Sequence, residues 1–381
     1  MNKKILYIIN EAYFFLSHKK ELAEQMKLRG YKVHVAVPKN HVWAPKNFSN
    51  NEILKSGFIL HEYDLSRRGQ NIFFEIKSFI QILRIIINVK PSILHLMTIK
   101  PIIYGGLFSI FFSKTIKVFS ITGLGQVFTE KTIYARIRRY MILKIFKYIF
   151  KSKKSYVIVQ NSYDLNQILE RNLIERDRLF LIKGSGVNLH EFPFTEESDI
   201  EIPRVILASR LLWEKGVKQF VDAARILKDK EINVSFILVG DTHASNPRSV
   251  PKKIIEKWVK NGLIEWWGRK ENMSEIISEC KIVCLPTVYG EGVPKILLES
   301  AAMGRPLVVS DHPGCKEVVT DRVSGLIAEG GKPEEIVRCI KELLGDHEFR
   351  KSLILDAYNK IVKEFSSEII IEQTIKIYEN D

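Results

Sequence analysis

The sequence predicts an α/β protein with two doubly wound parallel sheets, each in its own domain. The chain has 381 residues, more than one ordinary hydrophobic core contains, and 46% of them are hydrophobic and 27% charged, as in globular proteins. Short apolar strands alternate with helical segments, and the alternation starts again after the polar residues 195–199. Such alternation is typical of parallel sheets that are covered by helices on both faces.

The first half of the chain contains the first set of alternating elements. Apolar runs predict strands at residues 4–10, 32–37, 59–65, 93–97, 117–121 and 156–159. Apolar positions at helical spacing predict helices at residues 16–29, 73–89, 136–154 and 164–171. Gly30 is expected to end the first of these helices, because glycine readily adopts the left-handed conformation found after helix ends.

The second half repeats the pattern. Strands are expected at residues 204–208, 234–239, 264–267, 282–285 and 306–309, again separated by helices. A polar linker is expected near residues 185–201. The predicted domains therefore cover residues 1–185 and 186–365, and a final helix is expected in residues 366–381.

Charge is divided unevenly between the two halves. The whole chain carries a net charge of +14, but residues 1–190 hold 31 Lys or Arg against 12 Asp or Glu, a net +19. Within them, residues 136–154 interleave cations with large apolar side chains, which is typical of a helix that lies on anionic lipid. The alternative is a helix packed on the core with a solvated basic face. We expect the first domain to contact an anionic membrane surface.

The remaining composition favours the cytoplasm. The four cysteines have no paired C-x-x-C spacing, and no apolar segment with a small-residue cleavage site stands at the beginning of the chain. The longest nearly uncharged stretch, residues 101–113, is too short for a bilayer, which requires about 20 residues. We expect a cytoplasmic protein that associates peripherally with the inner face of the cell membrane.

Two carboxylates, Glu291 and Glu299, lie eight residues apart around a predicted helix start. Gly292 allows the backbone to approach a ligand, and Pro294 suits the first helical turn. The free N–H groups near residues 293–296 would attract a phosphate, and Glu299 could accept hydrogen bonds from sugar hydroxyls. This pattern predicts a site for a nucleotide diphosphate.

Two cations, Arg210 and Lys215, precede this pattern by about 80 residues and follow a predicted strand. Taken alone, each is better explained by a surface ion pair, for example with Glu214, and such pairs contribute little. Together with the two carboxylates they favour a functional site, in which they would add positive charge for a nucleotide diphosphate. No Asp-x-Asp sequence occurs, so neither a metal nor another cofactor is expected.

These segments resemble glycosyltransferase family 4. The resemblance rests on SRLLWEKG at residues 209–216, on Val239-Gly240, on EGVPKILLE at residues 291–299 and on VVSDHPG at residues 308–314. The N-terminal half is similar to bacterial members that build lipid-linked O-antigen or glycan repeats, through residues 7–18, 97–101 and 121–129. The resemblance implies the GT-B fold, with two Rossmann-like domains facing across a cleft, and implies that the terminal helix crosses back onto the first domain.

The resemblance also implies roles for individual residues. Arg210, Lys215 and Glu291 would be catalytic, with Glu291 holding the donor sugar, while Glu299 holds the ribose and the loop beginning at Arg269 contacts the base. The other expected donor-binding residues are Gly240, Gly292, Val293, Pro294 and Lys295.

Loops after the predicted strands of the first domain would bind the acceptor. The expected residues are Arg67, Arg68, Thr98, Lys100, Thr122 and Gly123. Two adjacent arginines can grip a pyrophosphate bidentately, although they can also be merely solvated. Some family members carry a histidine where this chain has Thr122, so no catalytic histidine is expected there.

The resemblance implies a retaining glycosyltransferase. It would move a hexose or N-acetylhexosamine from a nucleotide sugar, with a uridine diphosphate (UDP) sugar expected, to an undecaprenyl-diphosphate-linked saccharide. Front-face attack and a covalent intermediate both remain open. A nucleotide-sugar 2-epimerase has a similar fold, but the paired carboxylates with Arg210 and Lys215 argue against it. A nucleic-acid-binding protein that uses the basic half is an alternative from a different class, but no recognition motif or regular aromatic stacking pattern supports it, so no nucleic acid partner is expected. A purely structural membrane-docking module would have no use for the paired carboxylates.

Overall fold

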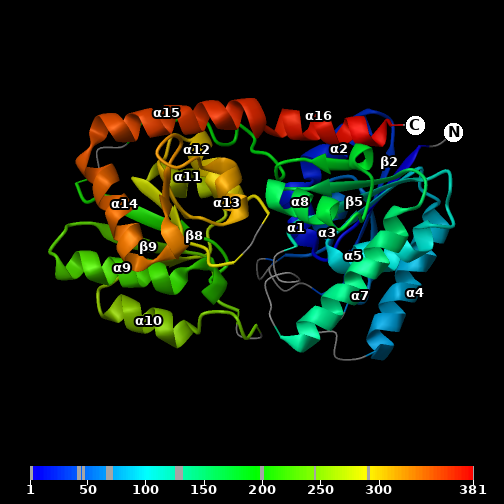
Figure 1. The fold of residues 1–381 in the computed structure, drawn as a ribbon, viewed down its shortest axis with the longest axis horizontal. Helices are drawn as coiled ribbons and strands as arrows, with labels where there is room; N and C mark the ends of the chain where they lie inside the picture. The colour runs from blue at the N-terminus through cyan, green and yellow to red at the C-terminus, as the bar shows by residue number, and fades with distance from the viewer. Residues whose placement is uncertain are drawn as a thin grey trace. The chain divides into compact units, whose positions relative to one another are not determined.

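The chain forms two compact units (Figure 1). One contains residues Met1–Ile182 together with Ile371–Asp381, and the other contains Lys183–Ile370. The computed structural model describes residues 3–40, 44, 48–65, 72–124, 132–197, 201–243, 246–289 and 292–380.

The first unit is built on a seven-stranded parallel sheet. Its strands are β1 (Lys4–Ile8), β2 (Lys32–Pro38), β3 (Ile59–Tyr63), β4 (Ile93–Met97), β5 (Ile116–Ile121), β6 (Ser155–Val159) and β7 (Leu179–Leu181), in the spatial order β3-β2-β1-β4-β5-β6-β7. Its helices are α1 (Ala12–His18), α2 (Lys20–Leu28), α3 (Asn51–Lys55), α4 (Ile72–Val89), α5 (Ile99–Ser109), α7 (Ile133–Phe150), α8 (Ser162–Glu170) and the short helix η1 (Arg176–Arg178).

Helices cover both faces of this sheet, which explains why its central strands are buried along their whole length. Every residue of β4 and β5 is buried. Leu94 and Leu96 pack in one core with Phe146 and Phe150 of α7. His95 points to the opposite face, where its Nδ1 lies 2.5 Å from the hydroxyl of Tyr378 in the terminal helix α16 (Ser367–Tyr378).

The second unit contains a six-stranded parallel sheet. Its strands are β8 (Arg204–Ala208), β9 (Ser235–Val239), β10 (Glu265–Gly268), β11 (Ile282–Leu285), β12 (Leu307–Ser310) and β13 (Leu326–Ala328), in the order β10-β9-β8-β11-β12-β13. Its helical elements are η2 (Trp213–Lys215), α9 (Val217–Asp229), α10 (Lys252–Lys260), α11 (Met273–Ser278), α12 (Lys295–Ala302), α13 (Pro313–Val318), η3 (Glu329–Gly331), α14 (Pro333–Gly345) and α15 (His347–Glu364), and α16 begins within this unit.

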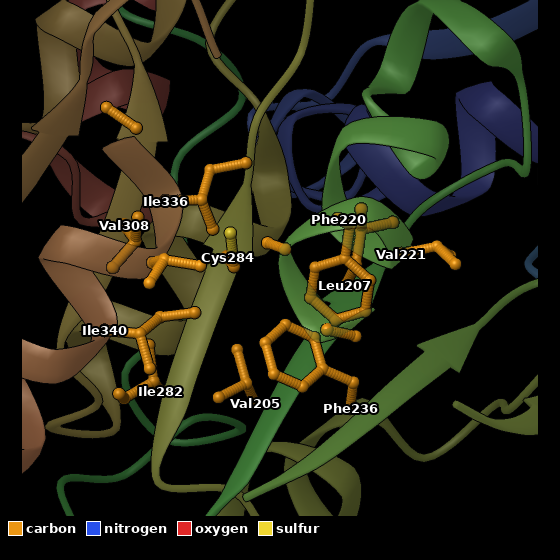
Figure 2. Close-up of a cluster of buried hydrophobic side chains, with 14 of the residues drawn as sticks. Val205, Leu207, Phe220, Val221, Phe236, Ile282, Cys284, Val308, Ile336 and Ile340 are labelled. Atoms are coloured by element: carbon orange, nitrogen blue, oxygen red, sulfur yellow. The ribbon is translucent and has the colours of Figure 1, made fainter. Parts of the chain in front are cut away.

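A hydrophobic core joins this sheet to α9 and α14 (Figure 2). Val205 and Cys284 of the central strands lie beside Phe220 of α9 and Ile340 of α14. The rings of Phe220 and Phe236 have their centroids 4.8 Å apart in a T-shaped arrangement, a favoured geometry for aromatic pairs.

The predicted fold class is confirmed, but one predicted helix was wrong and two short strands were missed. The helix expected over residues 16–29 is two helices, because Lys19 adopts φ −133° and ψ −1° and interrupts it. The short edge strands β7 and β13 were not predicted, since three apolar residues give too little periodicity. Among the helices that the structure describes, none is both long enough and apolar enough to cross a bilayer.

Candidate active site

The strand order of each sheet reverses once, between β1 and β4 in the first unit and between β8 and β11 in the second. In open parallel sheets, ligands bind outside the carboxyl ends of the strands at such a point. Arg210 follows β8, and Gly292 lies between β11 and α12. Thr98 follows β4 directly. The predicted donor and acceptor residues therefore include positions beside both reversal points.

Lys215 and Arg210 lie in the segment that links β8 to α9. Lys215 is only 8% exposed, at the end of η2, whereas Arg210 is exposed. Gly216 then adopts φ +77°, and a Cβ atom there would lie 1.9 Å from the carbonyl oxygen of Pro286. Only glycine fits this approach, which holds Lys215 against the loop after β11. That loop is also tied to η2 by the hydroxyl of Thr287, which donates to the Glu214 carbonyl at 3.0 Å.

Gly240 connects the carboxyl ends of three neighbouring strands. It has φ +135°, and a Cβ atom there would lie 1.9 Å from the carbonyl oxygen of Ser209. Its N–H donates to the carbonyl of Gly268 at 2.8 Å, and its own carbonyl accepts from the indole of Trp266 at 2.9 Å. Arg269 follows directly and is partly buried. Gly240 thus fixes the spacing between the segments that carry Arg210 and Arg269.

Helix α12 begins at the loop that contains Gly292 and Val293. Pro294 caps this helix in an extended conformation, and proline has no side-chain acceptor that could satisfy the first helical N–H groups. Those N–H groups and the helix dipole favour an anion at this end. Lys295 adds a cation in the first turn.

Glu299 lies within α12, as predicted, and is 6% exposed. Burial raises the pKa of its carboxyl, while Lys295 opposes the shift through an ion pair of 3.3 Å. A buried carboxylate of this kind gains from further hydrogen-bond donors, such as the hydroxyls of a sugar. Lys295 and Glu299 therefore present a cation and an acceptor side by side.

In the first unit, Thr98 caps α5 with φ +70° and ψ 161°, a conformation that is strained for a β-branched residue. Its N–H donates to the Ser120 carbonyl at 3.1 Å, which ties the end of β4 to β5. Its hydroxyl oxygen is buried and has no hydrogen-bond partner among the described residues. Thr122 and Gly123 follow β5, just as Thr98 and Lys100 follow β4. These four predicted acceptor residues therefore lie at the carboxyl ends of two neighbouring strands.

Lys100 lies in the first turn of α5 and is neutralised by Glu75 of α4. Its Nζ lies 2.7 Å from the Glu75 Oε1, and the hydroxyl of Tyr104 donates to the other oxygen of the same carboxylate. Nothing in the sequence pointed to Glu75, because a separation of 25 residues carries no local signal. Lys100 is thus part of an ion pair and not an isolated positive charge.

Three predicted site residues, Glu291, Arg67 and Arg68, lie outside the described residues. The structure groups the other predicted donor residues at the carboxyl ends of the strands of the second sheet, and it groups Thr98, Lys100, Thr122 and Gly123 at the carboxyl ends of the strands of the first.

Comparisons with known proteins identify both units. The family described as "Glycosyl transferase 4-like" matches residues 4–161, and the family described as "Glycosyl transferases group 1" matches residues 191–360. The chain is a glycosyltransferase. It combines a glycosyl transferase 4-like domain with a group 1 domain, as the resemblance of its motifs implied.

Similar proteins extend over most of the glycosyltransferase. The chain is 27% identical over 351 residues to the N,N'-diacetylbacillosaminyl-diphospho-undecaprenol alpha-1,3-N-acetylgalactosaminyltransferase of Campylobacter jejuni, covering 89% of this chain and 90% of that protein. It is 19% identical over 351 residues to the capsular polysaccharide biosynthesis glycosyltransferase CapM of Staphylococcus aureus, covering 87% and 90%.

Solved structures confirm the GT-B fold of this glycosyltransferase. Anabaena HepE in complex with UDP superimposes with a TM-score of 0.77 and 17% identity, over 99% of both chains. At this identity the likeness concerns the fold alone.

Proposed function

We propose that this glycosyltransferase moves a hexose or N-acetylhexosamine from a UDP-sugar to an undecaprenyl-diphosphate-linked saccharide, with retention of configuration and without a metal ion. The observation that carries the proposal is the similarity to the Campylobacter enzyme over 89% of the chain, because that enzyme's name specifies an N-acetylgalactosaminyl group and a diphospho-undecaprenol acceptor. The product would serve surface polysaccharide or glycan assembly.

The donor residues would act mainly on the leaving group. Arg210 and Lys215 neutralise the charge that develops on the departing UDP, and Lys215 acts from a largely buried position, where screening by water is weaker. The N–H groups at the start of α12, with Lys295, hold a phosphate. Glu299 accepts from the ribose hydroxyls.

The remaining donor residues would position the sugar and the base. Glu291 holds the donor sugar, and the loop from Arg269 contacts the base. Gly240 and Gly292 allow the backbone to lie close to the nucleotide, and the backbone N–H of Val293 adds a hydrogen-bond donor for a phosphate.

The acceptor would bind at the edge of the first sheet. The buried hydroxyl oxygen of Thr98 and the backbone of Thr122 and Gly123 offer hydrogen-bonding groups to a saccharide or diphosphate. Lys100 reaches an anion only in competition with Glu75, 2.7 Å away. Arg67 and Arg68 supply further positive charge for the acceptor diphosphate.

A membrane surface is proposed for α7 because its exposed side chains are both apolar and cationic. Tyr134 is 82% exposed and Tyr140 62%, and Ile137 and Met141 are exposed on the same helix. Arg138 and Lys144 are exposed on the same helix. This composition is typical of helices that bind anionic lipid in the plane of the interface, and it would keep the enzyme on the inner face of the cell membrane.

The reaction is tested with the purified protein, a panel of nucleotide sugars and a short-chain polyprenyl-diphosphate saccharide, with lipid-linked product detected by mass spectrometry. Product from one UDP-sugar, unchanged by a chelator and lost in Glu291→Ala but not in the exposed control Glu256→Ala, would support donor, acceptor and metal independence together. A loss of product with chelator would overturn metal independence alone. Nucleotide binding without any product would overturn the lipid-linked acceptor.

The membrane proposal is tested by sedimentation with vesicles. We expect binding to vesicles that contain anionic phosphatidylglycerol, weaker binding in high salt, and loss of binding when Tyr134, Ile137 and Tyr140 are replaced by serine. Leu355→Ser, an exposed residue of α15, is the control. Equal binding to purely zwitterionic vesicles would contradict the electrostatic part of the proposal.

A further inference from the structure

A buried aspartate, Asp164, joins two separate parts of the first unit. It lies in the first turn of α8 and is 3% exposed. Its Oδ2 accepts a hydrogen bond from the backbone N–H of Leu124 at 3.2 Å and another from the side-chain amide of Asn161 at 3.0 Å. Leu124 stands 40 residues earlier in the chain, immediately after Thr122 and Gly123. Asp164 therefore fixes the backbone of the loop that leaves β5.

The local helix geometry shows that this contact is not ordinary helix capping. Asn161 caps α8 by accepting from the N–H of Asp164 at 2.7 Å. In a capping box, the acidic residue three positions after the cap returns the bond to the backbone N–H of the capping residue. Here the carboxylate instead accepts from Leu124, in a different loop.

We propose that Asp164, with Asn161, is a positioning residue for the acceptor: it holds the backbone of Thr122, Gly123 and Leu124 in the conformation that receives the acceptor saccharide or its diphosphate. This inference rests on the proposed function, in which that loop binds the acceptor. Gly123 has φ +133°, so the loop passes through a conformation that residues with side chains rarely adopt. The Leu124 N–H, fixed by the carboxylate, determines where the preceding backbone points.

Stability alone does not explain an ionisable group at this place. Burial raises the pKa of the Asp164 carboxyl to about 6, although the bonds from Leu124 and Asn161 oppose the shift. The ionised form is therefore less favourable in the folded protein than in water. An asparagine could accept the same two bonds without that cost. The negative charge strengthens the bond to the Leu124 amide, which is useful where the loop must stay in place while a ligand binds.

The test compares Asp164→Ala, Asp164→Asn and the control Glu170→Gln, an exposed carboxylate on the same helix, in the full-length enzyme. Asp164→Ala leaves a buried N–H without its acceptor, so the KM for a short-chain polyprenyl-diphosphate saccharide should rise about tenfold or more, while the KM for the UDP-sugar stays within about twofold. Asp164→Asn should restore part of the acceptor affinity, because a neutral amide oxygen accepts the same bond more weakly than a carboxylate. Glu170→Gln should match the wild type.

The pH profile separates positioning from mere packing. As the pH falls through about 6, the carboxyl is protonated and its bond to Leu124 weakens, so kcat/KM for the acceptor should decrease in the wild type. Burial raises the pKa of Asp164, and the hydrogen bonds from the Leu124 amide and the Asn161 side chain lower it. Asp164→Asn, which cannot titrate, should lack that decrease.

Some outcomes would overturn the inference. They are an unchanged acceptor KM in a folded Asp164→Ala, an equal rise in both KM values, or a decrease near pH 6 that persists in Asp164→Asn. If Asp164→Ala does not fold, the pH profile of Asp164→Asn decides. If the wild type forms no product, the proposed function fails instead. In that case the role of Asp164 is tested by measuring the Kd of the polyprenyl-diphosphate saccharide directly. A Kd that is the same for the wild type and for Asp164→Asn across pH 5 to 8 refutes the positioning role.

Discussion

Replacing Gly216 by alanine should damage both stability and catalysis, because two backbone segments meet at this residue. Its φ of +77° costs a side-chain-bearing residue about 1–2 kcal/mol. An alanine Cβ would also lie 1.9 Å from the Pro286 carbonyl oxygen, whereas real Cβ contacts begin near 3.0 Å. The segment before α9 and the loop after β11 must then separate by roughly 1 Å, at a further cost of about 1–3 kcal/mol.

The separation would move Lys215, which is adjacent to Gly216, away from the proposed donor site. Misplacement by about 1 Å can lower the rate about 100-fold, so we expect kcat/KM for the UDP-sugar to fall by that order. A loss of about 2–5 kcal/mol should lower the melting temperature of a unit of this size by roughly 4–20 °C. Differential scanning calorimetry and initial-rate measurements test the two parts separately.

Gly30→Ala is the matched control. Gly30 has a similar φ of +82°, but a Cβ there would meet no atom within 4 Å. It should cost only the backbone penalty of about 1–2 kcal/mol and leave catalysis intact. If Gly216→Ala melts no lower than Gly30→Ala and keeps its catalytic efficiency, the close approach to Pro286 does not position Lys215.

Three further predictions concern buried polar groups. Burial, the neighbouring His61 and two lysines lower the pKa of His34 to about 4, below the unperturbed value of about 6.5. The free energy of unfolding should therefore keep its full value above pH 6.5 and decrease by about 1–3 kcal/mol towards pH 4. In urea titrations, His34→Gln should show a smaller decrease. Glu299→Gln should raise the donor KM about tenfold without lowering the melting temperature; an unchanged KM would remove Glu299 from the donor site. Arg350→Ala should destabilise the protein by about 1.5–3 kcal/mol in chemical denaturation, because Glu197 loses its bond from Arg350 at 2.9 Å but keeps its ion pair with Lys281 at 2.7 Å; a cost below about 0.5 kcal/mol would contradict this.

The fold could be predicted from the sequence because each central strand contains a run of apolar residues that can be recognised without knowing its neighbours. The runs at β1, β4 and β8 are mostly apolar, as is typical of strands buried on both faces. The strands β7 and β13 could not be found in this way, because three residues at a sheet edge depend on a neighbouring strand for their structure. Tertiary pairing, not local pattern, decides such segments.

The candidate site also contains residues with a local sequence signal and residues whose contacts depend on tertiary packing. The position of Glu299 and Lys295 in a helix could be predicted, because a proline and a glycine mark the helix start within a few residues. The ion pair of Lys100 with Glu75 and the bond from Leu124 to Asp164 join positions 25 and 40 residues apart. Such contacts depend on how strands and helices pack, and no spacing in the sequence encodes them.

The two kinds of residue also predict different experimental behaviour. A group that binds the leaving UDP contacts the reacting molecule, so its removal should lower kcat with every acceptor. Asp164 acts through the backbone of another loop, so its removal should affect acceptors in proportion to how far they rely on that loop. Comparing a full polyprenyl-diphosphate saccharide with the free saccharide would distinguish these cases. A smaller defect of Asp164→Ala with the free saccharide would assign the loop to the diphosphate end of the acceptor, and an equal defect would assign it to the sugar.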